Sequence, residues 1–332
     1  MFKKYNSIEN TYRKTFLEKI KGHGLWLKEY VVQEKVHGAN LSYITTDGQH
    51  FVGAKRRGLI GEEESFYNYN RILQSLQDKF TAIWEELKSK QPDLHHLIIF
   101  GELIGGSYPH KEVKQVKGAL KVQKGVFYSP DNHFLAFDIL INSTHYLGVE
   151  EVNYHFEKQG ILHAQTLFRG SIEDCLAYSN EFDSTIPKKL GFPLISPNIC
   201  EGVIIRPVET AHFNNSTRVI LKNKNEKWSE KKKFTKSIKK TDALPDKLSH
   251  LKAAILAYAT DNRLNNVLSK LGEVTHQDFG QVMGLYNKDI IEDFTKDYAE
   301  VFQALSKKEQ KSITKSIVKS TATLVRNKLI YV

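Results

Sequence analysis

The spacing of apolar residues changes once along the 332-residue chain, and this change limits the folds open to it. Up to about residue 235, short apolar runs of strand length alternate with polar residues: "LIIFGELIGG", "HFLAFDILI", "EGVIIRPV" and "STRVILKNK". Beyond residue 245 the spacing is helical, with Leu248, Leu251, Ile255 and Tyr258 on one face. We therefore predict an α+β domain over 1–240 and a small all-helical domain over 241–332. The lysine-dense "EKKKFTKSIKKTDALPDK" would link them.

Local signals refine this prediction. Asp47 and Gly48 favour a hairpin turn, and residues 64–90 carry apolar side chains at helical spacing. In the second domain, a helix through "NRLNNVLSK" would stop at Gly272. Thr275, with an acidic residue three positions later, is a weak variant of a helix capping box.

Composition excludes several classes of protein. No apolar run approaches the roughly 20 residues that span a bilayer, and the first residues lack the apolar core of a signal peptide. Cys175 and Cys200 lack zinc-site spacing, and one disulfide would be no framework. We expect a monomer in the cytoplasm or host-cell interior. The net charge of +10 suits a polyanionic partner such as nucleic acid.

The stretch "QEKVHGAN" places Lys35 between an apolar strand and a glycine turn. Lys-x-x-Gly occurs five times in this chain, so the tetrapeptide alone indicates nothing. The stretches that follow Lys35 distinguish it from the other four: "GAKRRG", "FGELIGG", "AFDIL", "EGVIIRP" and "VILKNKN".

These stretches appear in the order and at about the separations of the motifs shared by ATP-dependent ligases and capping enzymes. In detail the chain resembles the RNA ligase 2 family, which comprises bacteriophage nick-sealing RNA ligases and RNA-editing ligases. The resemblance runs nearly the whole chain. It implies a nucleotidyltransferase domain of ATP-grasp-like antiparallel sheets with helices, followed by a helical domain. One departure is visible, because Arg206 stands where the fourth motif usually has lysine.

The resemblance implies that Lys35 attacks the α-phosphorus of ATP and forms a lysyl-AMP. The AMP then moves to an RNA 5′-phosphate, and a 3′-hydroxyl displaces it. Lys222 and Lys224, two apart on a strand, would face the phosphates together, and His37 would belong to the same site. Glu201 would bind Mg²⁺ or Mn²⁺, and Asp138 would assist catalysis or support the structure.

The remaining nucleotide contacts are also implied by the resemblance. Glu34 would meet the adenine amino group through its carboxylate or backbone carbonyl, and Phe137 would stack on the purine unless it belongs to the core. Arg56 and Glu102 would hold the ribose hydroxyls, and Asn40 would orient metal-bound water. Arg206 would take the place of the motif lysine at the nucleotide.

The polynucleotide partner would be RNA with 3′-hydroxyl and 5′-phosphate ends, preferably a nicked duplex. The stretch from Lys222 to Lys240 contains nine lysines and only two glutamates, a composition that suits either a solvated linker or phosphate contacts. The lysine-bearing stretch from Gly105 to Lys124 is a second candidate strip. By resemblance, Arg263, Asp289 and Asp293 would handle the RNA end.

Two rival classes stay open. A DNA ligase or capping enzyme would ordinarily continue into an OB-fold, which consists of short strands, but the chain has only helical spacing after residue 245. A non-catalytic RNA-binding relative would not need Lys35, Glu201, Lys222 and Lys224, all of which are present.

Overall fold

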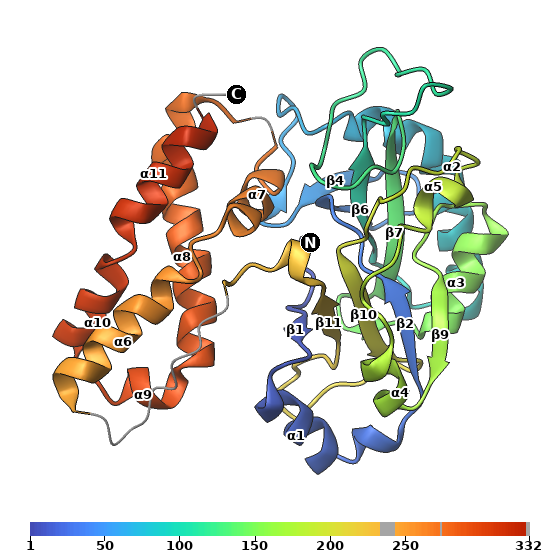
Figure 1. Cartoon of the computed structure of the whole chain (residues 1–332). Coiled ribbons are helices and arrows are strands. Elements are labelled where there is room, and N and C mark those ends of the chain that lie inside the picture. Colours follow the sequence, from blue (N-terminus) through green and yellow to red (C-terminus); the bar gives the residue numbers. More distant parts are fainter. Residues whose placement is uncertain (233–242, 273, 330–332) are drawn as a thin grey trace. The chain divides into compact units, whose positions relative to one another are not determined.

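The computed structural model describes residues 1–232, 243–272 and 274–329 (Figure 1). The chain divides into two compact units, Met1–Asn225 and Glu226–Val332. The first combines strands and helices and the described part of the second is helical, which confirms the predicted classes. The predicted boundary between residues 240 and 241 lies outside the described residues. No helix among them is long and apolar enough to cross a bilayer.

The first unit contains two sheets. The first sheet has the order β1-β11-β10-β2-β9, and all its neighbours are antiparallel except β1 and β11, which are parallel. Its strands are β1 (Glu9–Asn10), β2 (Tyr30–Glu34), β9 (Thr166–Gly170), β10 (Gly202–Pro207) and β11 (Leu221–Lys224). The helices α1 (Lys14–Gly22) and α4 (Ile172–Ala177) pack on its outer face through Ile20, Ile172 and Cys175, and the 3₁₀ turn η1 (Leu25–Leu27) packs there through Leu25 and Trp26.

The second sheet is antiparallel throughout, with the order β5-β4-β3-β6-β7-β8. Its strands are β3 (Ala39–Thr45), β4 (Val52–Lys55), β5 (Gly58–Leu59), β6 (Leu97–Gly105), β7 (Asn132–Ile141) and β8 (His145–Tyr146). The predicted hairpin at Asp47-Gly48 joins β3 to β4, and Gly48 has a φ of +76°. Figure 1 shows α2 (Tyr69–Lys90) and α3 (Val149–Lys158) beside this sheet.

Successive side chains along the strands of the second sheet point to opposite faces, so this sheet contributes to two separate hydrophobic cores. Leu41, Tyr43 and Ile99 face α2 and α3, whereas Ile98 and Phe100 face the first sheet. The layer between the sheets also takes a set of residues from other elements: Tyr5, Ile44, Ala54, Leu140, Ile204 and Ile220. The inner faces of the two sheets therefore meet. The short helix α5 (Ile186–Lys189) completes the first unit, and the 3₁₀ turn η2 (Glu226–Trp228) begins the second. Cys175 and Cys200 are buried free thiols.

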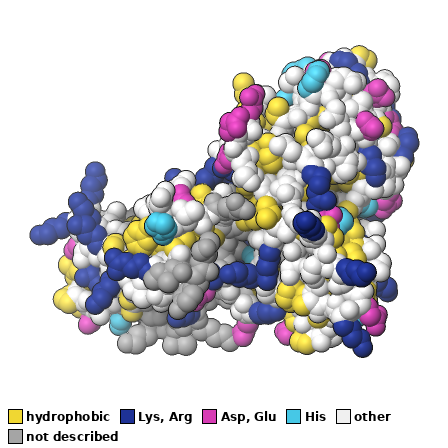
Figure 2. Space-filling view, turned by 90° about the horizontal axis from the view of Figure 1, so that it is seen from above, with side chains coloured by type: hydrophobic (Ala, Val, Ile, Leu, Met, Phe, Trp, Pro, Cys, Tyr) yellow, Lys and Arg dark blue, Asp and Glu magenta, His cyan; other side chains and the backbone are white. Residues whose placement is uncertain are grey.

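The second unit has its own core, centred on Leu251, Tyr286 and Phe294. Its helices are α6 (Leu244–Leu256), α7 (Asp261–Ser269), α8 (Phe279–Asp297), α9 (Ala299–Gln303), α10 (Lys307–Lys315) and α11 (Val318–Leu329). The capping box at Thr275 is present and begins a 3₁₀ turn, η3 (His276–Asp278), which leads into α8. Figure 2 shows Lys and Arg side chains spread over the viewed face.

Candidate active site

Three neighbouring strands of the first sheet bring the predicted lysines and Glu201 together. Lys35 directly follows β2, and its backbone N–H donates to the Gly202 carbonyl at 2.9 Å. Gly202 is in register with Lys224, and Ile204 with Lys222. Since alternate strand residues share a face, Lys35, Lys222 and Lys224 lie on the inner face that carries Ile204.

The Glu201 carboxylate is the centre of this group. Its Oε2 lies 2.6 Å from Lys35 Nζ and 3.5 Å from His37 Nδ1, and its Oε1 lies 2.6 Å from Lys224 Nζ. Burial alone would raise the Glu201 pKa, but the charges of Lys224 and Lys35 hold it well below the usual range. The Lys35 side chain is still 18% exposed, so it can meet a ligand.

The turn after Lys35 is held in place by contacts with β6 and with Tyr128. A Cβ at Gly38 would lie 2.2 Å from the Leu103 carbonyl oxygen, so only glycine fits against β6. The His37 backbone N–H donates to the hydroxyl of Tyr128 at 2.9 Å, and Tyr128 is fully buried. These contacts set the direction in which the Lys35 and His37 side chains leave the backbone.

The second sheet carries the predicted ribose and water-orienting residues. Asn40 is in register with Glu102, on the inner face that also carries Phe100. Arg56 lies two residues after Ala54 of β4, so it points to the same inner face. Its Nη1 donates to the Tyr5 carbonyl at 2.9 Å. Burial lowers the Arg56 pKa, and the nearby charge of Glu102 opposes that effect. Asn40 Nδ2 donates to the Gly101 carbonyl at 3.4 Å.

Glu34 lies elsewhere than the resemblance implied for its carboxylate. Its Oε1 accepts from Ser184 Oγ at 2.6 Å, and its Oε2 accepts from the N–H and Oγ1 of Thr185 at 2.8 and 2.7 Å. Glu34 and Lys35 are adjacent, so alternation sends their side chains to opposite faces of the sheet. Of the two adenine contacts considered for Glu34, only the backbone carbonyl is compatible with this arrangement.

We expect Glu34→Gln to lower the free energy of unfolding by about 1–3 kcal/mol, because an amide N–H₂ would face the donors of Ser184 or Thr185. The protein–AMP formation that the resemblance implies should slow as the end of β2 loses its anchor, while the KM for ATP stays unchanged. Chemical denaturation and initial rates test this. A raised KM with unchanged stability would instead place the carboxylate at the base. Thr185→Val should also lower the free energy of unfolding, but by less than Glu34→Gln.

Asp138 and Arg206 bind each other within a buried cluster. Arg206 Nη1 donates to Asp138 Oδ2 at 2.9 Å, and its Nη2 donates to the Phe137 carbonyl. Arg218 and the hydroxyl of Tyr5 donate to the same Oδ2. The arginine side chains are 3% exposed and Asp138 is not exposed at all. Arg206 alternates with Ile204 on β10 and Asp138 with Leu140 on β7, so the guanidinium at the motif position completes a buried ion pair in the layer between the two sheets.

Phe137 is half-buried and lies at the edge of the layer between the sheets. Its ring meets that of Tyr5 edge-on, with 5.0 Å between the centroids. It is thus both a core neighbour and partly accessible, so the structure is compatible with either of its expected roles.

The helical unit assembles Arg263, Asp289 and Asp293. Arg263 Nη1 donates to Asp289 Oδ2 at 2.5 Å and Nη2 to Asp293 Oδ2 at 3.0 Å. Glu230 Oε2 lies 3.8 Å from the same guanidinium. Burial would lower the Arg263 pKa, but the three carboxylates raise it. The Arg263 side chain is 3% exposed, whereas those of Asp289 and Asp293 are 32% and 21% exposed.

Several functional neighbours were missed by the sequence analysis. Arg218 lies an even number of residues before Lys222 and Lys224. If the chain there is extended, alternation of side chains would therefore place Arg218 on the same inner face. Tyr128, Ser184 and Thr185 reach the site from segments about 90 to 150 residues away. No local pattern marks such residues.

The donor set suits a metal held mainly by water and phosphate. Among the described residues, no group of three or more His, Cys, Asp or Glu side chains is placed to hold an ion. Glu201 offers one carboxylate and Asn40 an amide on the facing sheet. Mg²⁺ needs only one or two carboxylates when ATP phosphates and water complete its octahedron, so the residues fit such an ion.

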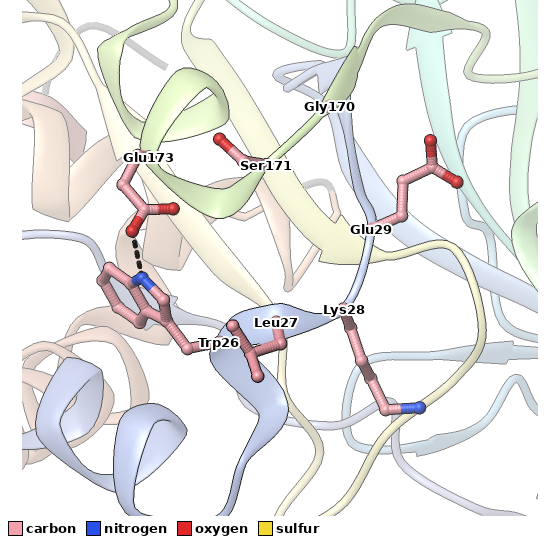
Figure 3. Close-up of a pocket in the computed structure, with 7 residues that line it drawn as sticks. All are labelled: Trp26, Leu27, Lys28, Glu29, Gly170, Ser171 and Glu173. Carbon is pink, nitrogen blue, oxygen red and sulfur yellow. Dashed lines mark hydrogen bonds between the residues drawn. The ribbon is translucent and has the colours of Figure 1, made fainter.

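A pocket of about 390 Å³ lies at the other end of β2 (Figure 3). It is lined by residues 26–29 and by Gly170, Ser171 and Glu173. Trp26 Nε1 donates to Glu173 across it. None of the residues predicted for nucleotide or RNA binding lines this pocket, so it is separate from the Lys35–Glu201 group.

Comparisons with known proteins show which family the chain matches. The model of the RNA ligase family matches residues 28–224, and that of the T4 RNA ligase 2 C-terminal domain matches 242–323. The chain is 30% identical to the mitochondrial RNA-editing ligase 2 of Trypanosoma brucei brucei, covering 98% of this chain and 90% of that protein. Mitochondrial RNA-editing ligase 1 of the same organism is 29% identical over 82% of this chain and 71% of that protein.

A structure of Naegleria gruberi RNA ligase with PPi matches 68% of this chain and 56% of that chain, at 13% identity and a TM-score of 0.44. The sheet-containing unit, the helical unit and the family models together define an ATP-dependent ligase enzyme. The chain belongs to the RNA ligase family.

Proposed function

We propose that this ligase seals 3′-hydroxyl/5′-phosphate breaks in RNA through a lysyl-AMP on Lys35. The observation that carries the proposal is the 2.6 Å contact between Lys35 Nζ and the buried carboxylate of Glu201, which also binds Lys224. A partly exposed lysine held in this way is positioned for attack on a phosphorus atom. ATP supplies the AMP, and nicked or templated RNA duplex is the preferred substrate.

The first step forms a bond between Lys35 Nζ and the α-phosphorus and breaks the bond to pyrophosphate. An ammonium has no lone pair, so Lys35 must lose a proton before it attacks; Glu201 Oε2 lies 2.6 Å from its Nζ. A divalent cation such as Mg²⁺, bound through Glu201 and phosphate, would supply positive charge that favours the neutral amine.

The other inner-face residues suit the nucleotide. Lys222 and Lys224 stabilise charge on the α-phosphate and the leaving pyrophosphate. Arg56 and Glu102 bind the ribose hydroxyls, Phe137 packs on the base, and Asn40 orients water on the ion. Asp138 and Arg206 support the site by joining β7 of one sheet to β10 of the other.

The test is incubation with α-labelled ATP or GTP and Mg²⁺, followed by denaturing electrophoresis. A label from ATP and not from GTP, transferable to RNA with a 5′-phosphate, is the expected result. GTP-derived label would favour a capping enzyme, and preference for nicked DNA would favour a DNA ligase. Folded protein, free of bound AMP, that takes no label would be a non-catalytic RNA-binding relative.

In the helical unit, Arg263 holds Asp289 and Asp293, whose partly exposed carboxylates would accept hydroxyls of the ribose at the RNA end. We expect Asp293→Asn to slow sealing of pre-adenylated RNA by about tenfold, the value of one lost hydrogen bond to a charged group. Protein–AMP formation should be unchanged. Sealing that falls only in parallel with a loss of stability would make the cluster structural.

A further inference from the structure

Residues Gly106–Pro130, called here the lysine loop, connect β6 to β7 and carry five lysines against one acidic residue, Glu112. Lys111, Lys114, Lys117, Lys121 and Lys124 are all exposed. The first three follow one another at three-residue intervals. Figure 1 shows the loop extending beyond the ends of β6 and β7.

Hydrogen bonds fix the base of the loop. Asn132 Nδ2 and Oδ1 pair with the carbonyl and N–H of Leu120 at 2.7 and 2.9 Å. Asn198 makes the same two-way pairing with Phe127 at 2.7 and 2.8 Å. Gly106 has a φ of +83°, and a Cβ there would lie 2.0 Å from the Leu120 carbonyl oxygen. The lysines therefore project from a scaffold of defined geometry rather than from a free linker.

The scaffold also contacts the active-site turn. The loop leaves β6 at the end where Leu103 is in register with Ala39, just beyond the Lys35–Gly38 turn. Tyr128, inside the loop, accepts a hydrogen bond from the His37 backbone N–H at 2.9 Å. Lysines on this loop thus lie at the same end of the sheet as the Lys35–Glu201 group.

We infer that the lysine loop binds the sugar-phosphate backbone of the polynucleotide beside the break that Lys35 acts upon. Exposed lysines on an ordered scaffold bind a regularly charged polyanion, and they contact phosphates without reading bases. The inference rests on the proposed function for the nature of the polyanion. The phosphates of ATP are the other phosphate source at this end of the sheet, so the test separates the two.

The test compares Lys111→Gln, Lys114→Gln and Lys117→Gln combined in one protein with a control triple variant. The control, Lys14→Gln with Lys19→Gln and Lys28→Gln, removes three exposed lysines near the start of β2, at the opposite end of this unit (Figure 1). Binding of a nicked RNA duplex with a 5′-phosphate and a blocked 3′ end is measured over a range of salt concentrations. Protein–AMP formation is measured on the same samples.

The loop variant should bind the duplex at least tenfold more weakly at low salt, with a log–log salt slope shallower by about one for each lysine that contacts phosphate. Its protein–AMP formation and its KM for ATP should equal those of the wild type. Binding and slope like those of the control variant would overturn the inference, as would a raised KM for ATP with unchanged RNA binding. Wild-type protein that forms no AMP adduct would refute the proposed function, and the RNA-binding comparison would still decide the role of the loop.

Discussion

Lys35→Ala should reduce the label that the protein takes from α-labelled ATP to background, a loss of at least roughly a thousandfold. The methyl group of alanine offers no nucleophile. Lys222 and Lys224, which the proposal assigns to the phosphates, also lie on the inner face and are retained in this variant. Glu201 keeps its contact with Lys224 in this variant, so we expect little loss of stability.

Lys35→Arg is the matched control. Arginine keeps a positive charge near Glu201 but does not deprotonate, so it should also form no adduct while melting close to the wild-type temperature. Both variants should still seal RNA that already carries a 5′-adenylate, because that substrate bypasses the first step. Label retained on Lys35→Ala would show that another residue is the nucleophile.

The active-site residues that the sequence identified are those set by alternation along single strands. Lys222 and Lys224 share a face because they are two apart, and Gly38 follows Lys35 where the backbone must approach β6. The same rule argues against a Glu34 carboxylate beside the Lys35 amine, since neighbours on a strand point apart. The alternation of β2 therefore favours the backbone carbonyl over the carboxylate, the two adenine contacts that the resemblance left open for Glu34.

Other contacts depend on how the sheets pack. The pairing of Arg206 and Arg218 with Asp138 joins β10 and the segment before β11 to β7, in the other sheet. Glu34 meets Ser184 and Thr185 about 150 residues away. Such partners are defined only once segments far apart in the sequence pack together, and no local spacing encodes that packing. Hairpins and caps, by contrast, are short-range, and the sequence predicted them correctly at Asp47-Gly48 and Thr275.

Asp138→Asn should lower the free energy of unfolding by about 3–5 kcal/mol, because it leaves Arg206 and Arg218 buried without a carboxylate. That is a large part of the total for a typical domain. Glu150→Gln is the control, since its partner Arg169 is 45% exposed and such surface pairs contribute about 1 kcal/mol or less. Urea denaturation of the full chain, followed at several wavelengths, measures both variants.

The stabilisation by Asp138 should depend on pH, in a direction set by its pKa. Burial would raise the Asp138 pKa, but Arg218 and Arg206 lower it below the ordinary value of about 3.9. The carboxylate therefore stabilises the fold above about pH 4, and its contribution is lost as the pH falls toward the folded-state pKa. The stability difference between wild type and Asp138→Asn should stay constant from pH 7 to 5 and narrow below pH 4. An unchanged unfolding curve with lost protein–AMP formation would instead make Asp138 a catalytic group, because a residue that only supports the two sheets affects activity through stability.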